Sequence, residues 1–133
     1  TCGQLLGLEI ANPHPGDGPK QTVFEADAGL LRAAQSVAWD KSSVVCGVIG
    51  SGDVWNNELD RIAWLHEQWG TLTEEMEAAA CAQICAAYQI PFLGVRILSN
   101  TAVHGEPFDA HTGIDCQRFV RTLLREYREQ NGC

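Results

Sequence analysis

Residues 90–100 read "IPFLGVRILSN", and the run from Phe92 to Leu98 is apolar almost throughout, with Arg96 as its one charged member. Such a run is typical of a strand buried on both faces, as in a parallel sheet covered by helices. A second apolar stretch, Val44 to Ile49 within "SSVVCGVIGSGD" (42–53), predicts another short buried strand. Gly70 to Thr73 is a third, shorter candidate.

Helices are predicted between and beyond these strands. Apolar residues recur at helical spacing in four segments, 25–39, 57–69, 75–88 and 115–130. Buried strands alternating with helices indicate an α/β fold with a mostly parallel sheet. Two or three strands are too few to close such a sheet, so we interpret the chain as half of a domain. A stretch rich in proline and glycine, "NPHPGDGPK" (12–20), predicts a loop.

The composition excludes some classes of binding partner. The 133 residues carry a net charge of −8, which argues against nucleic acid or an anionic membrane as the main partner. We find no apolar run of about 18 residues, the length that a membrane-spanning helix needs. The six cysteines form no CxxC pair and no zinc-finger spacing with histidine, so no metal site is predicted. Localisation stays open: the cysteine count and the absence of an initiator methionine lean toward a secreted or vacuolar compartment, with the cytoplasm as the alternative.

Three polar stretches follow predicted strands or open a helix. They are "SGDVW" (51–55), "EME" (75–77) and "RILSN" (96–100). Ligands of open α/β sheets gather at the carboxyl ends of the strands, so these stretches are the candidate site. The glutamates of the "EME" triplet have two interpretations. Either they favour the positive end of the third helix, or they line a pocket.

Taken in order, these motifs resemble a known family. "SGDVWNN" (51–57), "EEMEAAACAQIC" (74–85) and "IPFLGVRILSN" are similar to the C-terminal half of the nucleoside phosphorylase superfamily, nearest to its 5′-methylthioadenosine/S-adenosylhomocysteine nucleosidases. "FEADAGLLRAAQ" (24–35) matches a helix of that branch, and the likeness runs from Gly3 to about Arg128. It implies that residues 1–133 are the C-terminal half of a three-layer α/β domain with a mixed, mostly parallel sheet. It further implies an N-terminal half as a companion chain and a homo-oligomer of the assembled unit.

The resemblance also implies residue roles. Glu77 is expected to accept hydrogen bonds from ribose hydroxyls, since a carboxylate only accepts and can take two donors. Met76 is expected to pack on the sugar, and Glu75 to support or touch it. Trp55, where a phenylalanine is commoner, is expected to stack near the base. With these flanking motifs the pocket interpretation of the triplet is favoured over the helix dipole.

The pair Ser99–Asn100 departs from the family pattern. The nucleosidases have an aspartic acid at position 100, which protonates N7 of the leaving purine; asparagine has no proton to give but can donate a hydrogen bond. Because trimeric purine nucleoside phosphorylases use an asparagine for 6-oxopurines, Asn100 indicates either an altered base preference or a retained fold with weakened catalysis. Arg96 either braces the site by pairing with a carboxylate or satisfies a strand end.

The expected function is therefore binding of a purine nucleoside or free base and cleavage of the N-glycosidic bond. The reaction is hydrolysis, or phosphorolysis with phosphate as co-substrate, and no cofactor is expected. The alternative is a storage or ligand-binding protein on the same fold, like the bark and vegetative storage proteins of plants.

Overall fold

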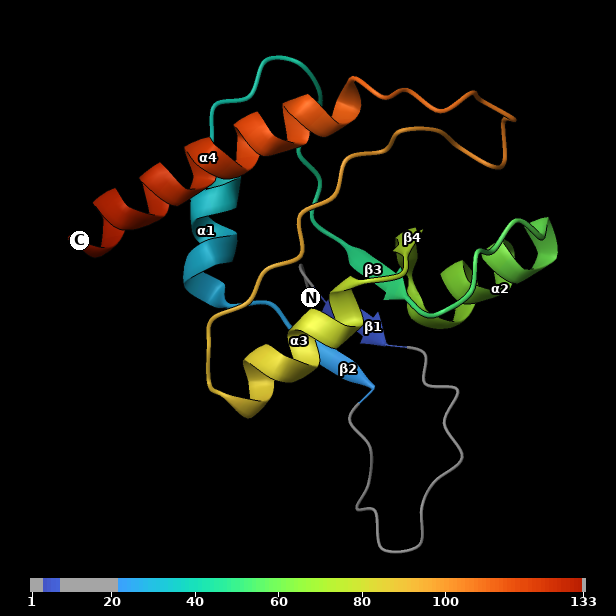
Figure 1. The fold of residues 1–133 in the computed structure, drawn as a ribbon, viewed down its shortest axis with the longest axis horizontal. Helices are drawn as coiled ribbons and strands as arrows, with labels where there is room; N and C mark the ends of the chain where they lie inside the picture. Colours follow the sequence, from blue (N-terminus) through green and yellow to red (C-terminus); the bar gives the residue numbers. More distant parts are fainter. Residues whose placement is uncertain (1–3, 8–21, 133) are drawn as a thin grey trace, which may run out of the picture.

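The computed structural model describes the backbone of residues 4–7 and all of residues 22–132 (Figure 1). The loop predicted at 12–20 lies outside the described residues. The elements in chain order are β1 (Gln4–Gly7), β2 (Val23–Glu25), α1 (Ala28–Ser36), β3 (Val48–Ser51), α2 (Leu59–Trp69), β4 (Thr71–Glu75), α3 (Ala78–Ala87) and α4 (Thr112–Asn131).

The described strands form one sheet in the order β2-β1-β3-β4. β3 pairs in parallel with both of its neighbours, whereas β1 and β2 are antiparallel. The prediction of a mixed, mostly parallel sheet is confirmed. β4 was foreseen as the short strand after the second helix, but β1 and β2 were missed, and β2 takes the start of a segment predicted to be helical.

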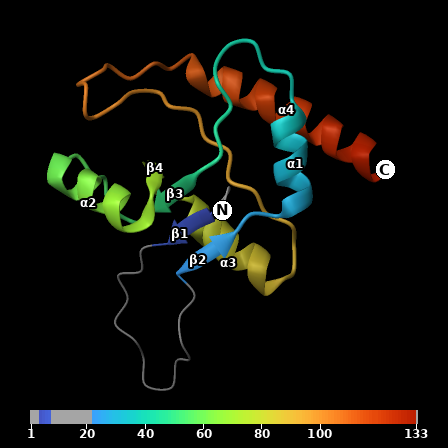
Figure 2. The ribbon, with the colours of Figure 1, turned by 180° about the vertical axis from the view of Figure 1, so that it is seen from behind.

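Helices α1 and α4 pack against each other away from the sheet (Figures 1 and 2). Asp27 begins α1 by accepting the Leu30 amide at 2.8 Å on its Oδ1 atom, which satisfies one of the free donors of the first turn. The apolar spacing of the last helix is confirmed in part as a buried face: Phe119 and Leu123 are buried against α1, whereas Leu124 is exposed. The ring of Trp39 meets that of Phe119 edge-on, with 5.5 Å between the ring centroids.

A second apolar cluster lies between α3 and the sheet. Ala78 and Ala82 are buried there together with Phe24 of β2, and Ile49 of β3 packs against them. The small alanine side chains let α3 lie close to the strands, in contact with β1 and β2. α3 begins directly after β4, with one pair of residues between Glu75 and Ala78.

The strand predicted from Phe92 to Leu98 is wrong: residues 90–100 form no strand or helix. Phe92 packs on the α3 cluster, whereas Leu93 and Val95 pack on the α1–α4 cluster. The segment is apolar on both sides because it runs between two apolar clusters, but no strand of the described part of the chain pairs with it.

Two other predicted boundaries shift. The strand expected at Val44–Ile49 begins only at Val48, because its partner β4 starts at Thr71 and Val48 is in register with that residue. The third helix begins at Ala78, not at Glu75, which is the last residue of β4. The "EME" triplet therefore spans a strand–helix junction, not the first turn of a helix.

Candidate functional site

The carboxyl ends of β3 and β4 meet at the candidate site. Ser51 and Glu75 are direct partners in the parallel ladder, and the Gly52 amide donates to the Glu75 carbonyl at 3.1 Å. Parallel register thus brings together the two motifs that the sequence had separated by more than twenty residues. Their meeting at this edge agrees with the expected place of ligand sites in open α/β sheets.

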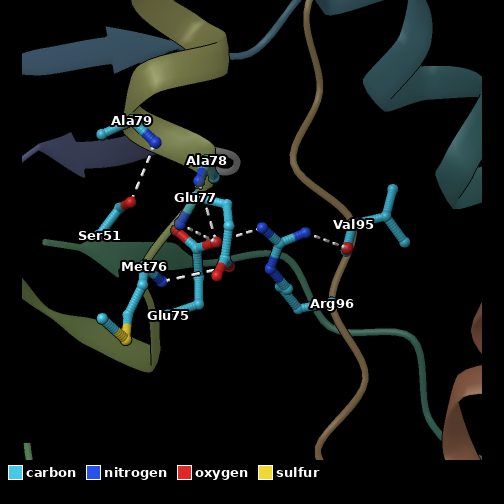
Figure 3. Close-up of polar contacts among 8 residues, drawn as sticks. All are labelled: Ser51, Glu75, Met76, Glu77, Ala78, Ala79, Val95 and Arg96. Carbon is cyan, nitrogen blue, oxygen red and sulfur yellow. Dashed lines mark hydrogen bonds and ion pairs between the residues drawn. The ribbon is translucent and has the colours of Figure 1, made fainter. Parts of the chain in front are cut away.

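The carboxylate of Glu75 is occupied by groups of the protein (Figure 3). It accepts the Ala78 amide at 2.9 Å and the Glu77 amide at 3.1 Å, and it forms an ion pair with Arg96. Its side chain is only 9% exposed. Glu75 therefore caps the start of α3 and ties it to the 90–100 segment. Of the two interpretations of Arg96, the structure supports the one in which it pairs with a carboxylate.

Electrostatics keep Glu75 ionised. Burial by itself raises the pKa of Glu75, but hydrogen bonds from Arg96, from Ser51 and from the Glu77 and Ala78 amides outweigh it. The net result is a pKa below the ordinary value of 4.5. The charge is thus present at neutral pH and complements both the arginine and the amino end of α3.

Ser51 opens the candidate stretch 51–55, but the sequence analysis gave its side chain no role. It is 2% exposed, and its Oγ atom accepts the Ala79 amide at 2.9 Å. This bond satisfies a second free amide of the first turn of α3. The signal was present in the sequence, since Ser51 opens the "SGD" turn directly after an apolar strand.

Glu77 and Met76 differ from Glu75 in being exposed. Glu77 holds the N-cap position of α3, but its side chain makes no capping hydrogen bond. Its Oε2 atom accepts a single long bond from the Met76 amide, at 3.4 Å. In Figure 3 the thioether of Met76 points away from Arg96. The two glutamates of the triplet therefore differ: the Glu75 carboxylate is held by groups of the protein, whereas the Glu77 carboxylate is exposed and accepts one long hydrogen bond.

The predicted base-binding residues are Trp55, Ser99 and Asn100. Trp55 is 76% exposed in the turn after β3. The Oγ atom of Ser99 donates to Oδ1 of Asn100 at 2.8 Å, at the far end of the 90–100 segment. Within the described ranges no hydrogen bond joins Trp55 or Asn100 to the Glu75–Arg96 pair.

Other kinds of site find no support in the described ranges. Residues 4–7 and 22–132 contain no group of three or more histidine, cysteine or acidic side chains placed to hold a metal ion. Cys46, Cys81, Cys85 and Cys116 are free thiols. Among the same residues, no helix has the length and apolar character needed to cross a bilayer.

The structure is thus an α/β protein with Ser51 and Glu75 at the carboxyl ends of two parallel strands. The chain belongs to the phosphorylase superfamily, whose family model matches residues 4–126.

Several individual proteins are similar to this chain. The chain is 39% identical to the 5′-methylthioadenosine/S-adenosylhomocysteine nucleosidase of Bacillus cereus (strain B4264) over 113 residues, which are 79% of this chain and 49% of that protein. The native structure of futalosine hydrolase of Helicobacter pylori strain 26695 superposes with a TM-score of 0.71 at 25% identity, over 94% of this chain and 57% of that one. Helicobacter pylori MTAN gives a TM-score of 0.72 at 23% identity, over 93% and 58%. The chain spans about half the length of the curated relatives it matches.

Proposed function

We propose that this chain supplies the sugar and base contacts of an enzyme that cleaves the N-glycosidic bond of purine nucleosides. The observation that carries the proposal is the division between Glu75, whose carboxylate is held by Arg96 and two amides, and Glu77, whose carboxylate is exposed with spare acceptor capacity. The membership in the phosphorylase superfamily and the likeness to a methylthioadenosine nucleosidase support it.

Glu77 is the proposed ribose ligand. Its carboxylate can accept from two neighbouring sugar hydroxyls at once. The same negative charge stabilises the positive charge that develops on the sugar as the glycosidic bond breaks. Met76, exposed beside it, provides an apolar surface for the sugar, and Trp55 a ring on which the base can stack.

Asn100 is the proposed contact for the base. Because its Oδ1 atom accepts the Ser99 hydroxyl, its Nδ2 atom remains a donor that can face an acceptor such as purine N7. A neutral amide donates without transferring a proton, so it stabilises a departing base less than an acid does. The Nδ2 donor can also face the 6-oxo oxygen of hypoxanthine, an acceptor that the 6-amino group of adenine does not offer, so we propose a preference for 6-oxopurine nucleosides such as inosine.

The attacking nucleophile is either water or phosphate, and phosphate would then be a co-substrate. The proposal requires no cofactor. We propose that the residues that choose between the two nucleophiles lie in an N-terminal half, which acts as a companion to this chain, and that the assembled unit is a homo-oligomer. The coverage of about half of each relative is consistent with such a division.

A second candidate is a storage or ligand-binding protein on the same fold. Asn100 favours it, because the residue offers no proton where the resembled nucleosidases have an acid. In this case nucleoside binding could remain while bond cleavage is lost.

The experiment that separates these candidates measures base release by the protein in its native assembly. Adenosine, inosine and methylthioadenosine are each supplied with and without phosphate, and products are followed by chromatography. We expect release, fastest from inosine, and loss of release in Glu77→Gln. Absence of release from all three substrates, together with no recovery in Asn100→Asp, would establish the storage or binding alternative.

A further inference from the structure

The turn that follows β3 is held at both of its ends by two consecutive residues of β4 (Figure 1). At the start of the turn, the Gly52 amide donates to the carbonyl of Glu75 at 3.1 Å. At its end, Nδ2 of Asn56 donates to Oε2 of Glu74 at 2.9 Å, and both of these side chains are partly buried. Glu74 therefore has a role different from that of Glu75, because its carboxylate reaches the turn and not the start of α3.

Gly50 leaves room for the Glu74 side chain to cross β3. The two residues are direct partners in the parallel ladder. A Cβ atom at position 50 would lie 3.3 Å from Cγ of Glu74, which is closer than an ordinary van der Waals contact. Successive side chains of a strand point to opposite faces, so Glu74 extends along the face of the sheet opposite to that of Glu75. The end of the turn is thus bound to the face of the sheet that α3 does not cover.

Trp55 lies between the two anchors, directly before Asn56. Its side chain is 76% exposed, so burial does not hold the ring in place. Residues 53–55 form no hydrogen bond with any residue in the described ranges, so the backbone around Trp55 is held through Gly52 and Asn56. Loss of one anchor would leave several residues to be ordered when a ligand binds, and this ordering costs conformational entropy.

We propose that Asn56 and Glu74 are positioning residues, whose hydrogen bond holds the 52–57 turn in the conformation in which Trp55 stacks on the purine base. Neither side chain needs to touch the nucleoside. The inference rests on the proposed function, in which Trp55 is the stacking surface, and adds the residues that set the affinity for the base. Because the turn is ordered before the ligand arrives, the bond lowers the cost of binding and leaves the bond-breaking step unchanged.

The test compares Asn56→Ala with Asn57→Ala in the assembled protein. Asn57 is the next residue of the same turn, and its side chain is exposed and forms no hydrogen bond within the described part of the chain. Titration calorimetry with inosine gives Kd, and base release gives KM and kcat. We expect Asn56→Ala to raise Kd and KM at least about fivefold with kcat within about twofold, since the turn must then be ordered on binding. Asn57→Ala should match the wild type.

Two results of this comparison overturn the proposal. One is an unchanged Kd for inosine in Asn56→Ala. The other is an equal loss of affinity in Asn56→Ala and Asn57→Ala, because the effect would then belong to the turn in general and not to the bond with Glu74.

Variants of Glu74 separate the hydrogen bond from other effects of substitution. Glu74→Gln keeps an oxygen that can accept from Nδ2 of Asn56, whereas Glu74→Ala removes the acceptor. We expect Glu74→Gln to bind inosine within about twofold of the wild type, and Glu74→Ala to lose as much affinity as Asn56→Ala. The double variant Asn56→Ala/Glu74→Ala should lose no more than either single variant. Independent effects that multiply in the double variant overturn the proposal.

A spectroscopic measurement follows the ring of Trp55 without a ligand. Fluorotryptophan replaces the four tryptophans, and Trp55→Phe assigns the fluorine resonance of Trp55. We expect this resonance to shift or broaden in Asn56→Ala and in Glu74→Ala, and to stay unchanged in Asn57→Ala. A Trp55 resonance that is the same in Asn56→Ala and in the wild type overturns the proposal, because the bond would then not hold the ring.

The outcomes separate this inference from the proposed function. Inosine binding that depends on Asn56, in an assembly that releases no base, would contradict the enzyme and leave the positioning role intact. Base release with the same KM in the wild type and in Asn56→Ala would support the enzyme and contradict the positioning role. Absence of inosine binding by the wild type would contradict both.

Discussion

The junction between β4 and α3 and the cleft between 41–47 and 93–98 are neighbours in the fold but differ in how their polar groups are satisfied. At the junction, Glu75, Ser51 and Arg96 satisfy one another and the first amides of α3. Along the cleft, two runs of backbone have no sheet partner among the described residues. The difference teaches that the polar groups of the junction are satisfied within this chain, whereas the 93–98 segment takes no part in the described sheet.

The largest effect is expected when the junction ion pair is broken. In the assembled protein, Arg96→Met leaves the nearly buried Glu75 carboxylate without its counter-charge. We expect the free energy of unfolding to fall by about 2–3 kcal/mol, less than for a fully buried pair because Arg96 is about one third exposed. Denaturant unfolding measures it.

The control for that variant is Arg61→Met on α2. Arg61 lies over the ring of Trp64 at 4.7 Å from the ring centroid, on an exposed helix face. Loss of such a contact is expected to cost about 0.5–1 kcal/mol. Equal losses in the two arginine variants would contradict the special role of the junction.

The next effect concerns Ser51. In Ser51→Ala the partly buried Ala79 amide loses its acceptor, so we expect a loss of about 1–2 kcal/mol in the free energy of unfolding. Ser43→Ala, at an exposed position in the wall of the cleft, is the comparison and should change stability by less than about 0.5 kcal/mol. The same denaturant experiment measures both, and a larger loss in Ser43→Ala would reverse the comparison between the two regions.

The pH dependence of stability gives a third expectation. Because the pKa of Glu75 is lower in the folded protein than its ordinary value of 4.5, its ionised form stabilises the fold above that pH. The contribution is lost as the pH falls below 4.5 through the folded-state pKa. The difference in unfolding free energy between the wild type and Glu75→Gln should therefore shrink on acidification. A difference that stays constant between neutral pH and the acid range would show that the charge of Glu75 does not stabilise the junction.

The smallest effect is expected for the ion pair at the rim of the cleft. Lys41 and Asp115 lie 2.6 Å apart, but the lysine side chain is 44% exposed, so solvent screens the attraction. We expect Lys41→Ala to leave the midpoint of chemical unfolding essentially unchanged. A shift as large as that of Arg96→Met would show that the rim of the cleft is as tightly organised as the junction.

The helices, and the meeting of two of the three candidate stretches, were predictable from sequence for local reasons. The apolar positions of α1 and α4 report burial within one element, which periodicity detects, whereas in α2 the spacing predicted the helix although Leu65 is its one buried residue. The motifs at Ser51 and Glu75 could be placed together because parallel strands end at one edge of a sheet. The α/β class and the mostly parallel sheet follow from the same local patterns.

The errors arose where a pattern had two physical causes. Continuous apolar residues from Phe92 to Leu98 fit a buried strand, but they equally fit a segment packed between two clusters. The start of α3 was placed at Glu75 because acidic residues favour a helix start; Glu75 does cap the helix, but from the end of the preceding strand. The pairing of Ser51 with the Ala79 amide depends on a tertiary contact that no local pattern encodes.

The central claim is that Glu77, not Glu75, meets the nucleoside. Titration calorimetry of the assembled protein with inosine, comparing the wild type with Glu77→Gln, tests it most directly. Glu67→Gln, at another exposed glutamate on α2, is the control. We predict that Glu77→Gln retains the thermal stability of the wild type and loses nucleoside binding, while Glu67→Gln binds normally. Unchanged binding by Glu77→Gln would contradict the assignment of the ribose ligand.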